Sequence, residues 1–262
     1  MERSTASFAT QVVSKVPEVT LGFWVIKVAA TTLGETGGDW VSMSLNLGYL
    51  IGSEIFLILF IGLVYAQVKA REFHRYLYWA TIVATTTLGT TMADFADRSL
   101  GVGYPGGASI VIALLIASLA IWYRSEGTVS VGSIVASKAE WFCWITILFS
   151  QTLGTALGDW VAGDDRGGLG IGYEYGAMLF GAGLVIVAAL YFWTRISRTV
   201  LFWSAFILTR PLGATLGDFL DKSVAQGGLH ISRLYASGIL LAFIVACIVL
   251  MPQHSAGREP AA

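Results

Sequence analysis

The stretch LGETGGDW, residues 33–40, is written four times in this chain with small changes. The other copies are LGTTMADF at residues 88–95, LGTALGDW at 153–160 and LGATLGDF at 212–219. Each copy reads L-G-x-x-x-[small]-D-[W/F], and each has a tryptophan ten residues before its glycine, namely Trp24, Trp79, Trp144 and Trp203. This recurrence indicates a chain built from four internal repeats.

The composition is that of a membrane protein. The chain has 262 residues, of which 55% are hydrophobic and 13% charged, whereas soluble domains carry about 25% charged residues. Residues 55–66, 108–123 and 177–193 form long apolar runs without charge, which is typical of membrane-spanning helices. The net charge of −1 offers no field that would attract nucleic acid. Cys143 and Cys247 lie in separate apolar segments, and we expect neither a disulfide nor a cofactor.

We therefore predict an all-α, polytopic transmembrane bundle of eight helices. The expected spans are residues 18–40, 48–67, 76–95, 109–123, 140–161, 175–193, 199–220 and 234–250. They form a single transmembrane domain, residues 17–250, made of four two-helix repeats at 17–68, 74–124, 138–194 and 198–250. Because each repeat has two helices, all four point the same way, so we expect pseudosymmetry about an axis along the membrane normal.

Lysine and arginine residues set the expected orientation. Ten of them lie on the side that holds both chain ends and four on the other side. Because positive charge is retained in the cytoplasm, we expect residues 1–16 and 251–262 to be cytosolic tails. The motif aspartates would then lie toward the outside.

A stripe of small residues follows one face of each motif helix. Steps of four residues around the motif glycine give Ala30, Gly34 and Gly38 in the first copy, and the other copies are equally small. Within a bilayer, small residues let helix backbones approach closely. We predict that the following glycines pack helices together: Gly34, Gly38, Gly89, Gly154, Gly158, Gly213 and Gly217.

The neighbouring face is polar and ends in the motif aspartate. Its members are Thr31, Glu35 and Asp39; Thr86, Thr90 and Asp94; Gln151, Thr155 and Asp159; and Arg210, Ala214 and Asp218. The first copy adds Lys27 one turn earlier. A charged side chain at the centre of a spanning helix costs about 2.5 to 3.5 kcal/mol on insertion scales. We therefore expect the four polar faces to line a common interior.

From this stripe we predict ion-binding residues. The primary set is Asp39, Asp94, Asp159, Asp218, Glu35, Lys27 and Arg210. The secondary set is Asp97, Asp221, Glu54, Thr31, Thr86 and Gln151. Two simpler interpretations stay open: the aspartates bond only the backbone of the following turn, or Lys27 and Arg210 form buried ion pairs with Glu35 or a motif aspartate.

Three local features add further expectations. Glu54 is an isolated acid in the second span and is a candidate partner for Lys27. Pro211 should kink the seventh span, because proline removes a backbone hydrogen bond. A glycine-rich turn before the even-numbered spans, LGVGY at 100–104 and LGIGY at 169–173, matches residues 45–49 loosely and residues 229–233 poorly.

The fourfold motif with two spans per copy resembles a bacterial membrane-protein family built from four tandem copies of a repeat of unknown function. The resemblance covers about residues 18–250. It implies eight spans and a location in the bacterial inner membrane, and it brings no catalytic residues.

The function we expect is that of a transporter or channel for a small ion, with the lipid bilayer as surroundings. Oxygen ligands without thiol or imidazole suit a hard cation such as Mg²⁺, Ca²⁺ or Mn²⁺, or a proton. The alternatives are a structural or sensor subunit, an anion transporter that uses the two fixed cations, and an intramembrane enzyme that uses Asp94 with Asp97 or Asp218 with Asp221. The sequence shows no nucleophile–base set, so an enzyme is not the expected function.

Overall fold

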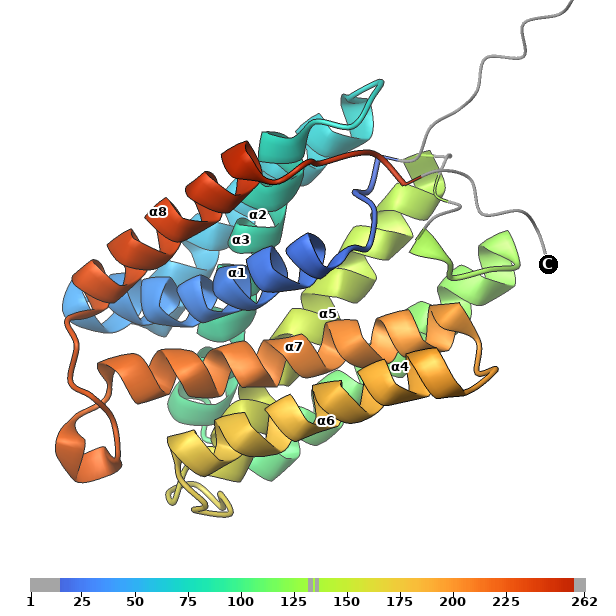
Figure 1. Ribbon diagram of the computed structural model, residues 1–262. Helices are drawn as coiled ribbons and strands as arrows, with labels where there is room; N and C mark the ends of the chain where they lie inside the picture. The colour runs from blue at the N-terminus through green and yellow to red at the C-terminus, as the bar shows by residue number, and fades with distance from the viewer. Residues whose placement is uncertain (1–14, 132–133, 135–136, 257–262) are drawn as a thin grey trace, which may run out of the picture.

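The computed structural model describes residues 15–131, 134 and 137–256, and within them the fold is a bundle of eight α-helices without a β-strand (Figure 1). The helices are α1 (Leu21–Asp39), α2 (Gly48–Lys69), α3 (Arg75–Asp94), α4 (Tyr104–Glu126), α5 (Ser137–Ala162), α6 (Tyr173–Trp193), α7 (Arg198–Asp221) and α8 (Arg233–Leu250). Two π-helical turns, η1 (Trp40–Ser44) and η2 (Phe95–Ser99), continue α1 and α3, and a 3₁₀ turn, η4 (Val224–Gln226), follows α7. The predicted all-α repeat architecture is confirmed.

The odd-numbered helices form an inner ring. Helix α1 packs against α3 and α7, and α5 packs against the same two helices. The even-numbered helices lie outside, and each covers the inner helix of the next repeat: α2 packs on α3, α4 on α5, α6 on α7 and α8 on α1 (Figure 1). The last repeat therefore closes onto the first, and the circle is complete.

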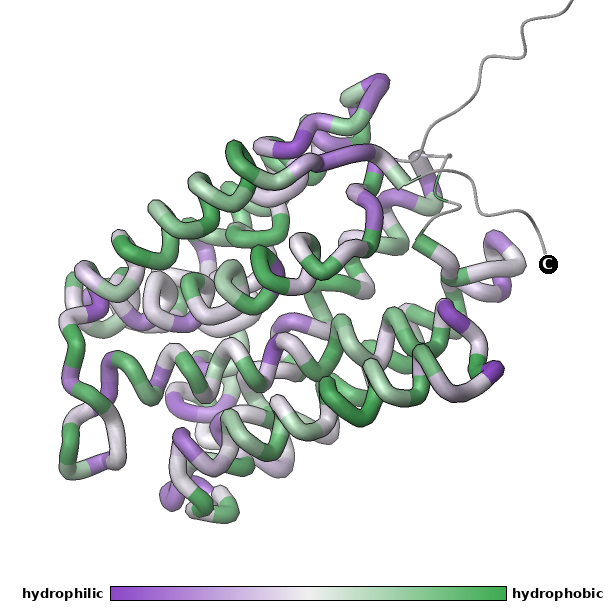
Figure 2. The backbone as a smooth tube through the Cα atoms, viewed as in Figure 1, coloured by the Kyte–Doolittle hydropathy of each residue, from purple (hydrophilic) through white to green (hydrophobic). Residues whose placement is uncertain are grey.

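Burial separates the two sets of helices. In the described part of the chain, five helices are long and apolar enough to cross a membrane, namely α2, α4, α6, α7 and α8. In the four outer ones, at most 22% of the most apolar 18-residue segment is buried. Figure 2 shows hydrophobic residues spread along α6 and α8. Helices α1, α3 and α5 contain 19, 20 and 26 residues but carry more polar side chains. These polar side chains are buried inside the bundle, which is where a bilayer protein places them.

The inner helices touch at the small stripe in one repeated pattern. Each motif glycine faces the residue three positions before the motif glycine of the next repeat: Gly34 faces Thr86, Gly89 faces Gln151, Gly154 faces Arg210 and Gly213 faces Thr31. A methyl group on any of these glycines would overlap the facing residue. Gly38, Gly158 and Gly217 face Thr90, Ala214 and Glu35 in the same way one turn later. The small stripe therefore makes room for the polar stripe of the neighbouring helix.

The turn before each outer helix is kept in all four repeats. Its second residue has a positive φ in every copy: 54° at Asn46, 70° at Gly101, 66° at Gly170 and 56° at His230. Asparagine tolerates this left-handed conformation better than most residues. The sequence match at residues 229–233 is poor, yet the backbone still makes the same first bend there.

Helix α7 is α-helical from Arg198 to Asp221, so Pro211 does not interrupt it. The proline that we expected to kink this span thus lies inside an uninterrupted helix. Thr215 donates its hydroxyl to the Pro211 carbonyl at 2.9 Å.

The chain segments around Pro17 and Ser255 pair at one end of the bundle. Pro17 and Ser255 form an isolated antiparallel bridge, and the Glu18 amide donates to the His254 carbonyl at 2.9 Å. We call this end the terminal end. The motif aspartates lie at the opposite end, which we call the aspartate end.

Candidate functional site

The four motif aspartates gather at the aspartate end of the inner ring. Asp39, Asp94, Asp159 and Asp218 each expose 3% of their surface or less. They come from equivalent positions on α1, α3, α5 and α7, so the glycine contacts that fix the register of these helices also bring the carboxylates to one level. Buried carboxylates need counter-charges or protons, and the structure supplies three cations.

Arg98 and Lys222 divide the aspartates into two pairs. Arg98 donates Nε to Asp94 and lies 3.4 Å through Nη2 from Asp159. Lys222 Nζ lies 2.7 Å from Asp39 and 2.9 Å from Asp218. Each cation follows its own motif aspartate by four residues and reaches the aspartate of the next repeat. The four aspartates therefore form two pairs, each bridged by one cation, and the site has approximate twofold symmetry.

Carboxylates set the charge state of both cations. Burial alone would lower the pKa of Lys222, but Asp218, Asp39 and Asp221 outweigh it and hold that pKa well above its usual value. Burial likewise opposes the charge of Arg98, and Asp94 with Asp159 raises its pKa. Both side chains are therefore fixed positive charges.

The fourth repeat adds a third cation, Arg233, at the position of the tyrosine in the other three turns. Its Nε donates to Asp221 at 2.8 Å and lies 3.6 Å from Asp39. In the second repeat the equivalent Asp97 has no such partner. Its carboxylate is fully buried against Gly107 of α4, without a hydrogen bond from the described residues. The pKa of Asp97 is raised to about 7, mainly by burial of its carboxyl group and to a lesser extent by the nearby charge of Asp94.

A second polar level lies one turn deeper and centres on Arg210. Its Nη2 atom donates to Thr90 and Thr155 at 2.5 Å each, and to the Glu35 carboxylate at 3.1 Å. Arg210 and Glu35 expose 0% and 2% of their surfaces. The structure thus shows a buried ion pair between the first and fourth repeats, held by hydroxyls from the second and third.

The third level holds Lys27, which is fully buried. Its Nζ atom lies 4.2 Å from the ring centre of Phe206, a residue that precedes Arg210 by one turn on α7. This Nζ atom donates no hydrogen bond to any atom of the described residues. The expected partner Glu54 is exposed on α2, so the Lys27–Glu54 pair is absent and Glu54 lies outside the polar interior. We call the three levels together the seam.

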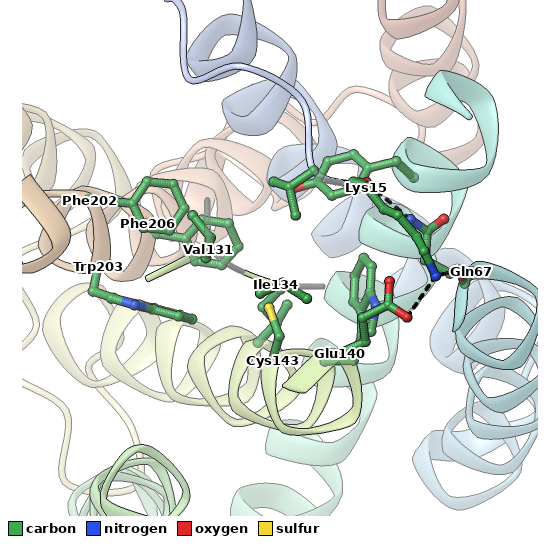
Figure 3. A pocket seen from close by; sticks show the side chains of 13 residues that line it. Lys15, Gln67, Val131, Ile134, Glu140, Cys143, Phe202, Trp203 and Phe206 are labelled. Carbon is green, nitrogen blue, oxygen red and sulfur yellow. Dashed lines mark hydrogen bonds and ion pairs between the residues drawn. The ribbon is translucent and has the colours of Figure 1, made fainter. Parts of the chain in front are cut away.

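A narrow cavity continues the seam toward the terminal end (Figure 3). Ile147 and Phe206 are among the residues that line it. Figure 3 shows Phe206 on one side and Lys15, Gln67 and Glu140 together on the other, where Lys15 Nζ bonds Glu140 at 3.0 Å. The cavity has a volume of about 20 Å³, which is room for one or two water molecules. The chain segment at Lys15 and Val16 contributes to the lining.

Comparison with protein families identifies the repeat. The sequence profile of the Repeat of Unknown Function (DUF347) matches four tandem segments, residues 22–73, 77–128, 142–197 and 201–251. The chain belongs to this family. Each DUF347 repeat contributes one inner helix with its motif aspartate and one outer helix, and the resemblance seen in the sequence is confirmed. No curated protein and no solved structure matches the chain significantly.

The sequence identified the carboxylates of the seam and the two deeper cations, Lys27 and Arg210, but not the cations at the aspartate end. Arg98, Lys222 and Arg233 are absent from the predicted set, because they lie outside the predicted spans, where charged residues are common. The second and fourth DUF347 repeats nevertheless carry a shared signal, DFADR at 94–98 and DFLDK at 218–222. It places a cation four residues after the motif aspartate, which is the spacing of a helical ion pair.

Proposed function

We propose that the protein transports a small ion through the seam, with protons exchanged on the buried carboxylates. The observation that carries this proposal is the continuity of the seam. Charged and polar groups occupy three successive levels from the aspartate end to Lys27, and the cavity begins beside the same level. Ionisable groups inside a membrane domain are costly and commonly mark ion or proton pathways.

Charge balance at the aspartate end supports a proton-coupled mechanism. Six carboxylates gather there, those of Asp39, Asp94, Asp97, Asp159, Asp218 and Asp221, and the described cations in contact with them are Arg98, Lys222 and Arg233. Full ionisation would leave three uncompensated negative charges out of water, which is strongly unfavourable. Protons on some of these carboxylates remove the excess, and their release and uptake would couple to ion movement.

Asp159 is the best candidate for the mobile proton. Among the four motif aspartates, it has the weakest pairing: in the described part of the chain its ion-pair partner is Arg98 at 3.4 Å, whereas Asp39 and Asp218 lie within 3 Å of Lys222. A weakly paired, buried carboxylate changes its protonation state with the least disturbance to its neighbours.

A hard cation is the second candidate, because two groups of three carboxylates converge. Glu35, Asp39 and Asp94 can bring one oxygen each within 4.8 Å of one another, and so can Asp39, Asp218 and Asp221. Oxygen ligands suit Mg²⁺, Ca²⁺ or Mn²⁺. The clamps at Arg98 and Lys222 compete with such an ion, and we therefore rank proton-coupled transport first.

We propose the bacterial inner membrane as the location, with both chain ends in the cytoplasm. Two observations support this orientation: the excess of lysine and arginine at the terminal end, and the gathering of carboxylates at the other. The cavity would then open from the cytoplasm, and the aspartate pairs would face outward.

Ion flux into proteoliposomes tests the proposal. With a pH-sensitive dye inside, the wild type should move protons when an ion gradient is applied, and Asp159→Asn should lower the rate at least tenfold. Asp164→Asn is the matched control, because Asp164 is exposed in the following loop. The proposal would be overturned if vesicles with the wild-type protein moved protons no faster than empty vesicles, or if Asp159→Asn moved them at the wild-type rate. Adding Mn²⁺ or Mg²⁺ to the same assay separates the two candidates.

A further inference from the structure

The middle of the seam has more hydrogen-bond donors than partners. At the two deeper levels of the polar stripe, four fully buried side chains keep polar atoms without a hydrogen bond from the described residues: Lys27 Nζ, Thr86 Oγ1, both amide atoms of Gln151, and Nε and Nη1 of Arg210. They come from α1, α3, α5 and α7, one from each inner helix. Buried polar groups are otherwise almost always satisfied, so these four require an explanation.

Thr86, Gln151 and Arg210 occupy equivalent positions on α3, α5 and α7, each against the motif glycine of the preceding repeat. Arg210 Nη2 is 3.4 Å from the Thr86 carbonyl oxygen and 2.5 Å from Thr155 Oγ1, and Gln151 precedes Thr155 by one turn on α5. Lys27 lies over Phe206, which precedes Arg210 by one turn on α7. We call these four residues the central donor site.

The unpartnered atoms are mostly donors, and the charge is positive. An ammonium group has three N–H donors, the free guanidinium atoms of Arg210 have three, and the Gln151 amide has two, whereas the acceptors are one amide oxygen and one hydroxyl. Among the described residues of the inner helices, three charged side chains are buried between the aspartates and the level of Phe206: Lys27 and Arg210, and the opposing Glu35. Glu140, which is buried nearer the terminal end, pairs with Lys15. One positive charge is left over.

We infer that the central donor site binds one small monovalent anion between Lys27, Gln151 and Arg210. A single negative charge balances the excess and accepts hydrogen bonds from the free donors. The side chains of Lys27, Gln151 and Arg210 are fully buried, which favours a halide-sized ion over a bulky organic acid. This inference rests on the proposed function, since it names the ion that the seam would carry together with protons.

A route from the terminal end reaches this site. Ile147 and Phe206 line the cavity, and each stands one helical turn before a member of the central donor site, Gln151 and Arg210. An anion entering from that end would meet Lys27 first.

Chloride-dependent stability of the purified full-length protein tests the inference. Thermal unfolding is followed in detergent at constant ionic strength while sodium chloride replaces sodium gluconate, whose anion is too large for the site. The wild type should be stabilised by chloride in a saturable manner. Lys27→Met should abolish the effect, and Gln151→Leu should raise the apparent Kd for chloride about tenfold. Lys69→Met, which changes the lysine at the end of α2, is the control and should keep the wild-type Kd.

Two results would overturn the inference: equal unfolding temperatures in the two salts, or a saturable chloride effect that Lys27→Met and Gln151→Leu both retain. Gln151→Leu leaves every charge in place, so it decides the matter even if Lys27→Met fails to fold. Chloride binding without flux in proteoliposomes would leave this site intact and overturn the transport function. Flux without chloride binding would overturn this site and leave the transport function intact.

Discussion

The buried pair of Arg210 and Glu35 allows a sharp test of the charge balance inside the bundle. Both side chains are fully or almost fully buried, and their charged atoms lie 3.1 Å apart. Removing one partner of a buried ion pair costs about 3–5 kcal/mol, because the other charge stays buried without compensation. Replacing both partners by apolar residues is often neutral or stabilising.

The two single variants should differ because Lys27 adds a second cation. Glu35→Met leaves Lys27 and Arg210 without an anion, so its loss of unfolding free energy should lie at the upper end, about 5 kcal/mol. Arg210→Met leaves one lysine and one glutamate, which balance, and its loss should lie nearer about 3 kcal/mol. The double variant should lose less than either single one.

Unfolding by sodium dodecyl sulfate in mixed micelles measures these free energies, and the four proteins form a double-mutant cycle. Glu72→Met is the control, because Glu72 is exposed in the turn between α2 and α3 and should change stability by less than about 0.5 kcal/mol. Additive losses in the double variant would refute the pairing. Arg210→Met less stable than Glu35→Met would refute the excess of positive charge.

Three further predictions follow from the packing and the aspartate end. Gly154→Ala should destabilise the bundle by about 1–3 kcal/mol or more, because a methyl group would overlap the Arg210 side chain, whereas Gly181→Ala in α6 meets no atom within 4 Å and should be neutral in the same unfolding assay. Asp97 has a pKa of about 7 in the fold and about 3.9 in the unfolded chain; the fold therefore holds a proton that the unfolded chain releases, and stability should fall as the pH rises from about 4 to about 7. Asp97→Asn should flatten the melting temperature across this window, and an unchanged slope would contradict the assignment. Lys222→Met should lower the melting temperature by removing the clamp between Asp39 and Asp218, with partial recovery in Asp39→Asn/Lys222→Met, whereas no recovery would argue that Lys222 acts through other contacts.

The sequence sufficed for the repeat, the eight helices and the two stripes, because each is local. Gly34 and Glu35 lie on neighbouring faces of one helix, and helical periodicity alone separates their roles. The pairing of each outer helix with the next repeat could not be predicted. A short connection from α1 to α2 brings two helices close, yet it does not say whether α2 then packs on α1 or on α3.

One buried ion pair that the sequence suggested forms, between Arg210 and Glu35, but other expectations about charge failed because they depend on how the helices pack. Lys27 was expected to pair with Glu54, but α2 turns that face outward and Lys27 stays inside without an acid beside it. Arg98 and Lys222 look like loop charges until the ring brings Asp159 and Asp39 next to them. Pro211 does not break α7, which packs tightly against α1 and α5 through Gly213 and Gly158.

Accessibility of the seam to water is the most direct test of the ion-pathway proposal. Thr155 is fully buried and bonded to Arg210, so a transporter must expose this level to water during its cycle, whereas a static scaffold need not. In a variant with Cys143 and Cys247 replaced by serine, Thr155→Cys in native membranes should react with a charged, membrane-impermeant thiol reagent. It should react faster than Ile186→Cys on the exposed face of α6. Labelling of Thr155→Cys no faster than that of Ile186→Cys would contradict the proposal that the seam is an ion pathway.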